Sequence, residues 1–188
     1  MIFVTVGTTD FDALVHKMDE LAPQLGEPVV AQIGRGKYIP QRMEYFRFAP
    51  SLDPYYERAR VVVSHGGLGT VIEVLQRGIK LVALSNPDRY DLHQEDLLAA
   101  LESRGHLVWC RRLQDLPLAL AEVERRTLVP YSSPPCHIAQ VIRRYLGLEC
   151  KDCQRGEHSF SSNGYLDVVY WGMAHERRIL WGGFPSLK

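Results

Sequence analysis

The sequence lacks a surplus of charge of either sign. Lys and Arg together number 22, as do Asp and Glu, so the formal net charge is +0. A protein that binds nucleic acid regardless of its sequence needs a basic surplus, because its affinity comes from releasing counterions from phosphates. We therefore expect no nucleic-acid partner, although a local basic patch is compatible with this balance.

A long apolar run is also missing. The N-terminal run MIFVTV is too short for a secretory signal sequence and has no basic flank. No stretch approaches the ~20 apolar residues of a membrane-spanning helix, so any work at a membrane is expected to go through the surface or a partner. Cysteine is scarce, and without a secretory signal the four thiols are expected to be reduced.

Internal repeats and low-complexity tracts are absent too. What remains is ordinary, since 46% of the 188 residues are hydrophobic and 23% are charged. This is the composition of a soluble globular protein, with room for one α/β domain and an appendage.

Strand-like apolar runs alternate with helical patterns along the first 110 residues. Strands are expected at 2–6, 29–33, 45–49, 60–65, 80–85 and 106–110, and helices at 11–25, 52–59, 68–78 and 94–105. This alternation predicts an α/β fold, a Rossmann-like parallel sheet with helices on both faces. Such sheets bind ligands beyond the carboxyl ends of their strands.

Two further helices, expected at 113–126 and 132–148, close this domain. The second places Ile138, Val141, Ile142 and Tyr145 on one face, which suggests that it folds back on the sheet. We therefore predict one domain over 1–148 and a C-terminal extension over 149–188.

The stretch SHGGLGTVIEVLQRG, residues 64–78, joins the most apolar strand to an amphipathic helix. It fits neither familiar phosphate loop, because Gly69 is followed by Thr70 without a lysine and Ile72 stands where a dinucleotide loop needs glycine. A helix N-terminus still offers free N–H groups and partial positive charge to an anion. The alternative is a tight strand-to-helix turn without a ligand.

Other polar loops are expected at the same edge of the sheet. Gly7, Thr8 and Thr9 would offer N–H groups to a phosphate, unless Thr9 or Asp10 only caps the following helix. Gly34 and Arg35 would bring a cation to the phosphate or an acceptor, unless Arg35 only faces water. Asp91, His93 and Gln94 have the donors and acceptors that sugar recognition needs, although a helix-capping loop explains part of that stretch.

Glu73 also has two interpretations. A carboxylate can accept hydrogen bonds from both hydroxyls of a vicinal diol. Thr70 and Glu73 also match a capping box, in which the glutamate satisfies the backbone at the start of the helix.

The segments VVVSHGGLGTVIEVLQRG and NPDRYDLHQEDL resemble the loop-and-helix and the sugar loop of glycosyltransferase family 28, whose members are GT-B enzymes. MIFVTVGTTDFDAL and AQIGRG resemble one subgroup of small half-enzymes. These are the catalytic subunit of the dolichol-pathway N-acetylglucosaminyltransferase and its bacterial capsule and exopolysaccharide relatives. The resemblance covers roughly residues 1–148.

This resemblance implies roles for the residues that match. Glu73 would accept hydrogen bonds from the ribose of a uridine nucleotide, and Asp91 and Gln94 would bind the hydroxyls of the transferred sugar. The diphosphate would lie against the glycine loop and its neighbours, His65, Gly66, Gly67, Gly69 and Thr70. The general base stays unassigned, with His65 as the one candidate we name, since GT-B enzymes often supply the base from their other domain.

The family implies the catalytic, donor-binding subunit of a two-component, inverting glycosyltransferase. It would transfer sugar from a UDP-sugar to a lipid-linked acceptor at the cytoplasmic face of a membrane, held there by a membrane-anchored partner subunit. No cofactor or metal is expected, since the sugar loop lacks an Asp-x-Asp motif. The alternatives are a UDP-sugar epimerase, which would need two complete domains, and a non-catalytic subunit that binds the nucleotide sugar or enhances its partner's activity.

The tail contains a pair of cysteines, Cys150 and Cys153, followed by His158 and His175. These are zinc-ligand types, but the second paired motif of a structural zinc site is missing, so reduced thiols are the default. The tail also carries an aromatic cluster, which favours docking onto a partner, a membrane or the chain's own core. The cluster consists of Tyr165, Tyr170, Trp171, Trp181 and Phe184.

Overall fold

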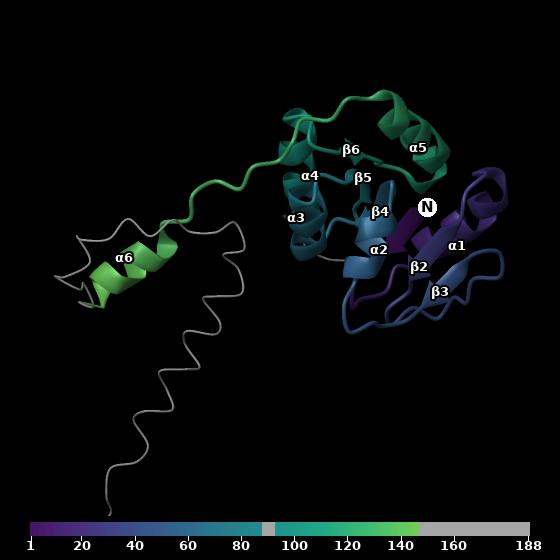
Figure 1. Ribbon diagram of the computed structural model, residues 1–188, viewed down its shortest axis with the longest axis horizontal. Helices are drawn as coiled ribbons and strands as arrows, with labels where there is room; N and C mark the ends of the chain where they lie inside the picture. The colour runs from purple at the N-terminus through teal and green to yellow at the C-terminus, as the bar shows by residue number, and fades with distance from the viewer. Residues whose placement is uncertain (88–92, 147–188) are drawn as a thin grey trace, which may run out of the picture. The chain divides into compact units, whose positions relative to one another are not determined.

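The computed structural model describes residues 1–87 and 93–146 (Figure 1). Close contacts divide the chain into two compact units, Met1–Pro134 and Pro135–Lys188. The sequence-based division into 1–148 and 149–188 stays a prediction.

The first unit is built on a parallel sheet, which confirms the predicted fold class. Six strands pair in the order β3-β2-β1-β4-β5-β6 within the described residues. They are β1 (Ile2–Thr5), β2 (Val29–Gln32), β3 (Glu44–Phe46), β4 (Val61–His65), β5 (Lys80–Leu84) and β6 (Val108–Trp109). The order reverses between β1 and β4, and at such a switch point parallel sheets bind their ligands.

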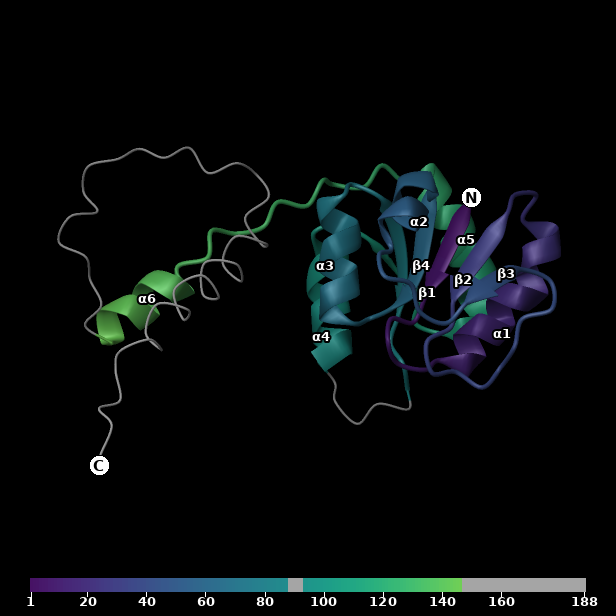
Figure 2. The ribbon, with the colours of Figure 1, turned by 60° about the horizontal axis from the view of Figure 1, so that its bottom comes forward.

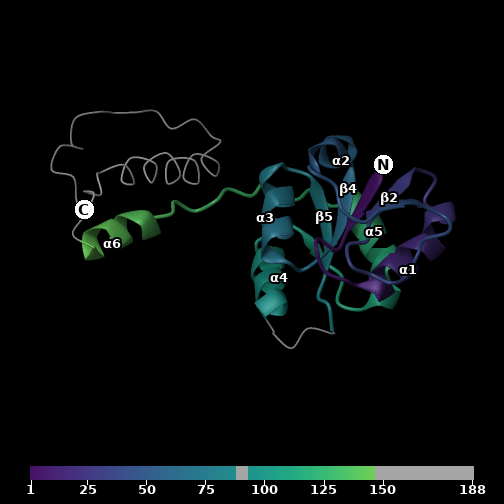
Figure 3. The same cartoon turned by 90° about the horizontal axis from the view of Figure 1, so that it is seen from below.

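Helices cover both faces of the sheet, as Figures 2 and 3 show. α1 (Asp12–Leu21) and α5 (Leu116–Arg125) pack on one face. On the other face pack α2 (Asp53–Arg58), α3 (Leu68–Gln76) and α4 (His93–Ser103). Every residue of β1 and β4 is buried, which explains why both strands read as continuous apolar runs.

Both ends of the first helix differ from the sequence-based prediction. The helix expected over 11–25 ends at Leu21 and tightens into a 3₁₀ turn, η1 (Ala22–Gln24), which contains Pro23. The predicted cap at Thr9 or Asp10 is wrong. Phe11 precedes the helix, and the Thr9 hydroxyl donates to the carbonyl of Val6 at 2.8 Å instead.

The helix expected over 113–126 also begins with a 3₁₀ turn, η2 (Leu113–Asp115), before α5 starts. Gly105 closes α4 as predicted. It has a φ of +76°, in the left-handed region that favours glycine, and its N–H donates to the carbonyl of Glu102 at 2.8 Å.

The second unit contains α6 (Ile138–Tyr145), which confirms a helix here, but the helix begins six residues later than the predicted Ser-Pro entry at residue 132. The apolar side chains predicted to share one face are exposed on it, from 49% for Ile142 to 88% for Tyr145. The predicted packing of this helix on the sheet stays a prediction. Among the described residues, no helix is long and apolar enough to cross a membrane.

Candidate functional site

The His65 imidazole lies against two glycine loops at the carboxyl edge of the sheet. A Cβ atom on Gly67 would lie 2.5 Å from His65 Nε2, and one on Gly7 would lie 3.2 Å from His65 Cε1. The chain after β1 and the chain after β4 therefore both approach the imidazole closely because these positions have no side chain. The structure thus brings Gly7, His65 and Gly67 together, next to Thr70, whose hydroxyl oxygen lies 3.8 Å from the same Gly7 position.

The loop after β2 lies against the loop after β1. A Cβ atom on Gly34 would lie 2.3 Å from the Thr9 carbonyl oxygen and 2.8 Å from that of Gly7. The N–H of Arg35 donates to the Thr9 carbonyl at 2.9 Å. Arg35 and Thr8 are both exposed, so this loop pair presents a guanidinium and a hydroxyl at the same edge as His65.

Helix α3 begins directly at this edge, with Gly67 as its N-cap and Leu68 as its first residue. The first N–H groups of a helix have no acceptor within the helix, and the helix dipole adds partial positive charge there. No side chain of the described residues caps them. The helix start therefore has the properties of an anion site.

Two of the three glycines in this loop are explained by packing, and the third is not. Gly66 is buried under α4, because a Cβ atom there would lie 3.0 Å from Leu98 Cδ1 and 3.1 Å from Gln94 Cβ. At Gly67, the His65 imidazole leaves no room for a Cβ atom. At Gly69, apart from its two chain neighbours and the backbone of α3 itself, no heavy atom of the described residues lies within 4 Å of the position of a Cβ, and its φ is not positive. Packing within this part of the chain therefore leaves the glycine at 69 unexplained.

Glu73 lies in the second turn of α3, so the capping-box interpretation is wrong. The helix begins at Leu68 without a side-chain cap, which places Thr70 inside the helix rather than at its N-cap. The Glu73 carboxylate instead accepts from the Tyr56 hydroxyl at 3.4 Å and from the Arg77 guanidinium at 3.3 Å. Its side chain is 44% exposed, which leaves the carboxylate accessible.

Of the predicted sugar loop, the structure describes the side chain of Gln94. Its Oε1 accepts from the Asn86 N–H at 3.0 Å, and its Cβ lies beside Gly66. The sugar-binding role of Gln94 stays a prediction. Asp91 lies outside the described residues, and His93 is described only as the first residue of α4.

Asn86 is a residue of this edge to which the sequence motifs assigned no binding role. It is 5% exposed, and its Nδ2 donates to the Asp10 carbonyl at 3.0 Å. Together with the Gln94 bond, this connects the loop after β5 to the loop after β1 and to α4. Its position just after β5 was the signal, since polar residues at that end of a parallel strand face the binding edge.

The described residues contain no group of three or more His, Cys, Asp or Glu side chains placed to hold a metal ion. The predicted zinc-ligand types in the tail lie outside these residues. Of the cysteines that the structure describes, Cys136 is exposed and Cys110 is buried, and both are free thiols. Burial raises the pKa of the Cys110 thiol to about 11, so this side chain is part of the core and not a nucleophile.

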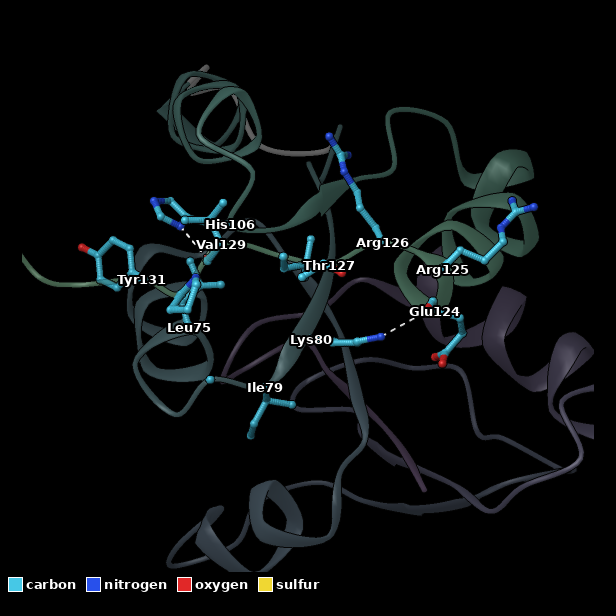
Figure 4. A pocket seen from close by; sticks show the side chains of 13 residues that line it. Leu75, Ile79, Lys80, His106, Glu124, Arg125, Arg126, Thr127, Val129 and Tyr131 are labelled. Carbon is cyan, nitrogen blue, oxygen red and sulfur yellow. Dashed lines mark hydrogen bonds between the residues drawn. The ribbon is translucent and has the colours of Figure 1, made fainter.

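A separate crevice of about 360 Å³ lies at the opposite edge of the sheet, where β5 starts (Figure 4). The Lys80 ammonium group donates to the Glu124 carbonyl at 3.0 Å there, and His106 Nδ1 lies 2.9 Å from the Val129 carbonyl oxygen. The crevice lies at the amino end of β5, which runs from Lys80 to Leu84 parallel to β4. The glycine loops lie at the carboxyl ends of the parallel strands, so the two places are at opposite ends of the sheet.

Solved structures share this fold. The crystal structure of Acinetobacter baumannii MurG matches 65% of this chain and 41% of its own with a TM-score of 0.52 at 21% identity. The solution structure of ALG13 matches 76% of this chain and 93% of its own with a TM-score of 0.51 at 18% identity. At these identities the likeness shows the fold alone. The protein is a Rossmann-like domain of the kind found in GT-B glycosyltransferases.

The sequence comparison is more specific. The family model described as "Glycosyltransferase family 28 C-terminal domain" matches residues 1–143, so the chain belongs to that family. The UDP-N-acetylglucosamine transferase subunit ALG13 of Homo sapiens is 36% identical over 122 residues, which are 58% of this chain and 11% of that protein. The ALG13 of Yarrowia lipolytica is 28% identical over 123 residues, 57% of this chain and 63% of that protein. The chain thus spans less than two thirds of the length of these relatives.

Proposed function

We propose that this chain is the catalytic, donor-binding subunit of a two-component glycosyltransferase. It transfers a sugar from a UDP-sugar to a lipid-linked acceptor in the biosynthesis of a polysaccharide, such as an exopolysaccharide, or of a glycolipid. Membership of family 28 supports the sugar-transfer chemistry. The name of the ALG13 relatives, a UDP-N-acetylglucosamine transferase subunit, supports both the uridine donor and the need for a second subunit.

The observation that carries this proposal is Gly69. Glycine in a helix is less favourable than alanine by up to about 1 kcal/mol, and Gly69 is the second residue of α3. The backbone at Gly69 needs no positive φ, and apart from its chain neighbours and the backbone of α3 no heavy atom of the described residues lies within 4 Å of the position of a Cβ. A ligand that lies directly on the first turn of α3 accounts for this glycine, and a diphosphate is the ligand that a helix N-terminus favours.

The arrangement suits the departure of a nucleoside diphosphate. As the bond from the sugar to the diphosphate breaks, negative charge grows on the phosphate that leaves. The first-turn N–H groups of α3 would stabilise that charge without reorganising. The N–H groups of Gly7 and Thr9, by contrast, already donate to Thr5 Oγ1 at 3.1 Å and to the Val6 carbonyl at 3.3 Å. In an inverting transfer, the acceptor hydroxyl attacks the opposite face of the sugar and its proton goes to a general base, which we leave unassigned.

A membrane-anchored partner would supply the acceptor site and hold this chain at the cytoplasmic face of the membrane. Helix α6 supports an association of this kind, because its exposed side chains Ile138, Val141 and Tyr145 are apolar while Arg143 and Arg144 are basic. Aromatic and aliphatic side chains of this kind are typical of the centres of protein interfaces.

The proposed ribose contact predicts the behaviour of Glu73→Gln. We expect UDP to stabilise the wild-type fold more than GDP, ADP or dTDP does, and Glu73→Gln to bind UDP tenfold or more weakly, on the order of the 1.5–3 kcal/mol of one charged hydrogen bond. Calorimetric titration and thermal shifts with the four nucleotides measure both effects.

Glu122→Gln is a matched control. Glu122 lies on α5, is about half exposed, and pairs with Arg126 four residues on, as Glu73 pairs with Arg77. Helix α5 packs on the opposite face of the sheet from α3, so the substitution of Glu122 should leave UDP binding unchanged. Equal UDP affinities for the wild-type protein and Glu73→Gln would remove the ribose role.

A further inference from the structure

The Glu73 carboxylate is held by two residues that lie outside the glycine loops. The Tyr56 hydroxyl, on α2, donates to Glu73 Oε2 at 3.4 Å. The Arg77 guanidinium, one turn further along the chain than Glu73, donates to Oε1 at 3.3 Å. Each oxygen thus accepts one hydrogen bond from the protein, and a carboxylate oxygen has two acceptor sites.

Arg77 is itself fixed from a second direction. Its guanidinium forms an ion pair with Asp53, at the start of α2, and its central carbon lies 5.0 Å from the centre of the Tyr56 ring. Ser51 orients Asp53 in turn, since its hydroxyl donates to Asp53 Oδ2 at 2.6 Å. Burial alone would lower the pKa of Arg77, but the carboxylates of Asp53 and Glu73 raise it above its ordinary value, so the cation persists at any working pH.

Tyr56 is the buried one of the two residues that donate to Glu73. It is 1% exposed and packs edge-on against Phe3 with 5.5 Å between the ring centres. Its hydroxyl keeps its proton, because burial and the nearby Glu73 charge raise the pKa of the phenol. A donor fixed in the core on one oxygen and an ion pair on the other restrict the rotation of the Glu73 side chain, 44% of which is exposed.

We infer that Tyr56 and Arg77 are positioning residues that hold the Glu73 carboxylate in one orientation, with one acceptor site of each oxygen left for the two hydroxyls of a ribose diol. This inference rests on the proposed function. It extends the donor site from the glycine loops to helix α2, which no sequence motif assigned to the site. A preorganised acceptor pair gains affinity because the side chain loses less freedom when the ligand binds.

The test compares the binding of UDP with that of 2′,3′-dideoxy-UDP, which lacks both ribose hydroxyls. Tyr56→Phe keeps the buried ring and removes the donor, and Arg77→Met keeps the length and removes the charge. We expect each to weaken UDP binding about three- to tenfold, as the loss of one hydrogen bond does. Neither should change the binding of 2′,3′-dideoxy-UDP. Arg77→Lys should fall between Arg77→Met and the wild type, because an ammonium keeps the charge but lacks the planar guanidinium that lies over the Tyr56 ring.

Two further variants separate this role from a general effect on stability. Arg126→Met breaks the equivalent ion pair to Glu122, at 3.1 Å on α5, and should change neither affinity. In the double variant Tyr56→Phe/Glu73→Gln, UDP should bind no more weakly than to Glu73→Gln alone, because Tyr56 acts through Glu73.

Each remaining outcome has a definite meaning. If Glu73→Gln weakens UDP binding while Tyr56→Phe and Arg77→Met do not, the positioning role is wrong and the proposed function stands. If these two variants weaken both nucleotides equally, their role is structural and the inference is also wrong. If the wild-type protein binds UDP and 2′,3′-dideoxy-UDP equally, the ribose role of Glu73 fails and the positioning role fails with it.

Discussion

Gly69→Ala is expected to make the unliganded protein more stable and to weaken its binding of UDP. Alanine is favoured over glycine in a helix, so the free energy of unfolding should rise by up to about 1 kcal/mol. Beyond its chain neighbours and the backbone of α3, the new methyl group would meet no heavy atom of the described residues, but it would occupy the surface on which we place the diphosphate. We expect UDP affinity to fall by at least about tenfold, as measured by calorimetric titration beside urea unfolding.

Gly67→Ala is the matched comparison two residues earlier. Its methyl group would lie 2.5 Å from His65 Nε2, so the imidazole or the loop has to move, at a cost of about 1–3 kcal/mol in stability. UDP affinity should fall here as well, but together with stability. The opposite sign of the stability change is what identifies Gly69 as a ligand contact. A Gly69→Ala protein that binds UDP as the wild type does would contradict the diphosphate site at α3.

The second large effect concerns the partner. We expect the purified chain to bind UDP but to transfer little or no sugar to a lipid-linked acceptor. Addition of the membrane-bound partner should raise the rate by at least about a hundredfold, because orienting two reactants removes several kcal/mol from a barrier. The described residues provide one sheet with the candidate donor loops at its edge, and within them we find no second sheet to hold an acceptor.

Transfer of radiolabelled sugar, with and without membranes that contain the partner, measures this effect. Co-purification with a membrane protein, before and after deletion of residues 149–188, shows whether the C-terminal extension contributes to the association. Leu118→Ser serves as a control for the loss of an exposed apolar side chain elsewhere, since Leu118 is 70% exposed on α5 in the first unit. It should change neither co-purification nor transfer. Robust turnover by the isolated chain would contradict the two-component proposal.

Much of the fold could be predicted because its signals are local. The valine run of β4 indicates a buried strand, and Gly105 indicates the end of a helix. The structure has both features where the sequence predicted them. The helix caps were harder. Thr9 and Thr70 both have side chains that can cap a helix, but α1 begins two residues later, and α3 three residues earlier, than a cap at these threonines requires. Local chemistry allows several starting points, and tertiary packing selects one.

The parts of the site that the sequence missed are contacts between distant elements. Asp53 to Arg77, Tyr56 to Glu73 and Asn86 to Asp10 each join residues from different helices and loops. Such pairs depend on how helices pack on the sheet, which leaves no local pattern. Arg77 is the partial exception, because it follows Glu73 by four residues and that spacing places opposite charges together on a helix.

The central claim is that a nucleoside diphosphate binds at the carboxyl edge of this sheet, and an amide-resolved NMR titration of the chain with UDP tests it most directly. We expect saturable shifts at the backbone N–H groups of 7–9, 34–35 and 66–70, where the glycine loops and the start of α3 lie. The matching shifts should shrink in Gly69→Ala. Saturable shifts confined to the opposite edge, at Lys80 and 124–131 around the other crevice, would contradict the account, as would a titration without saturable shifts.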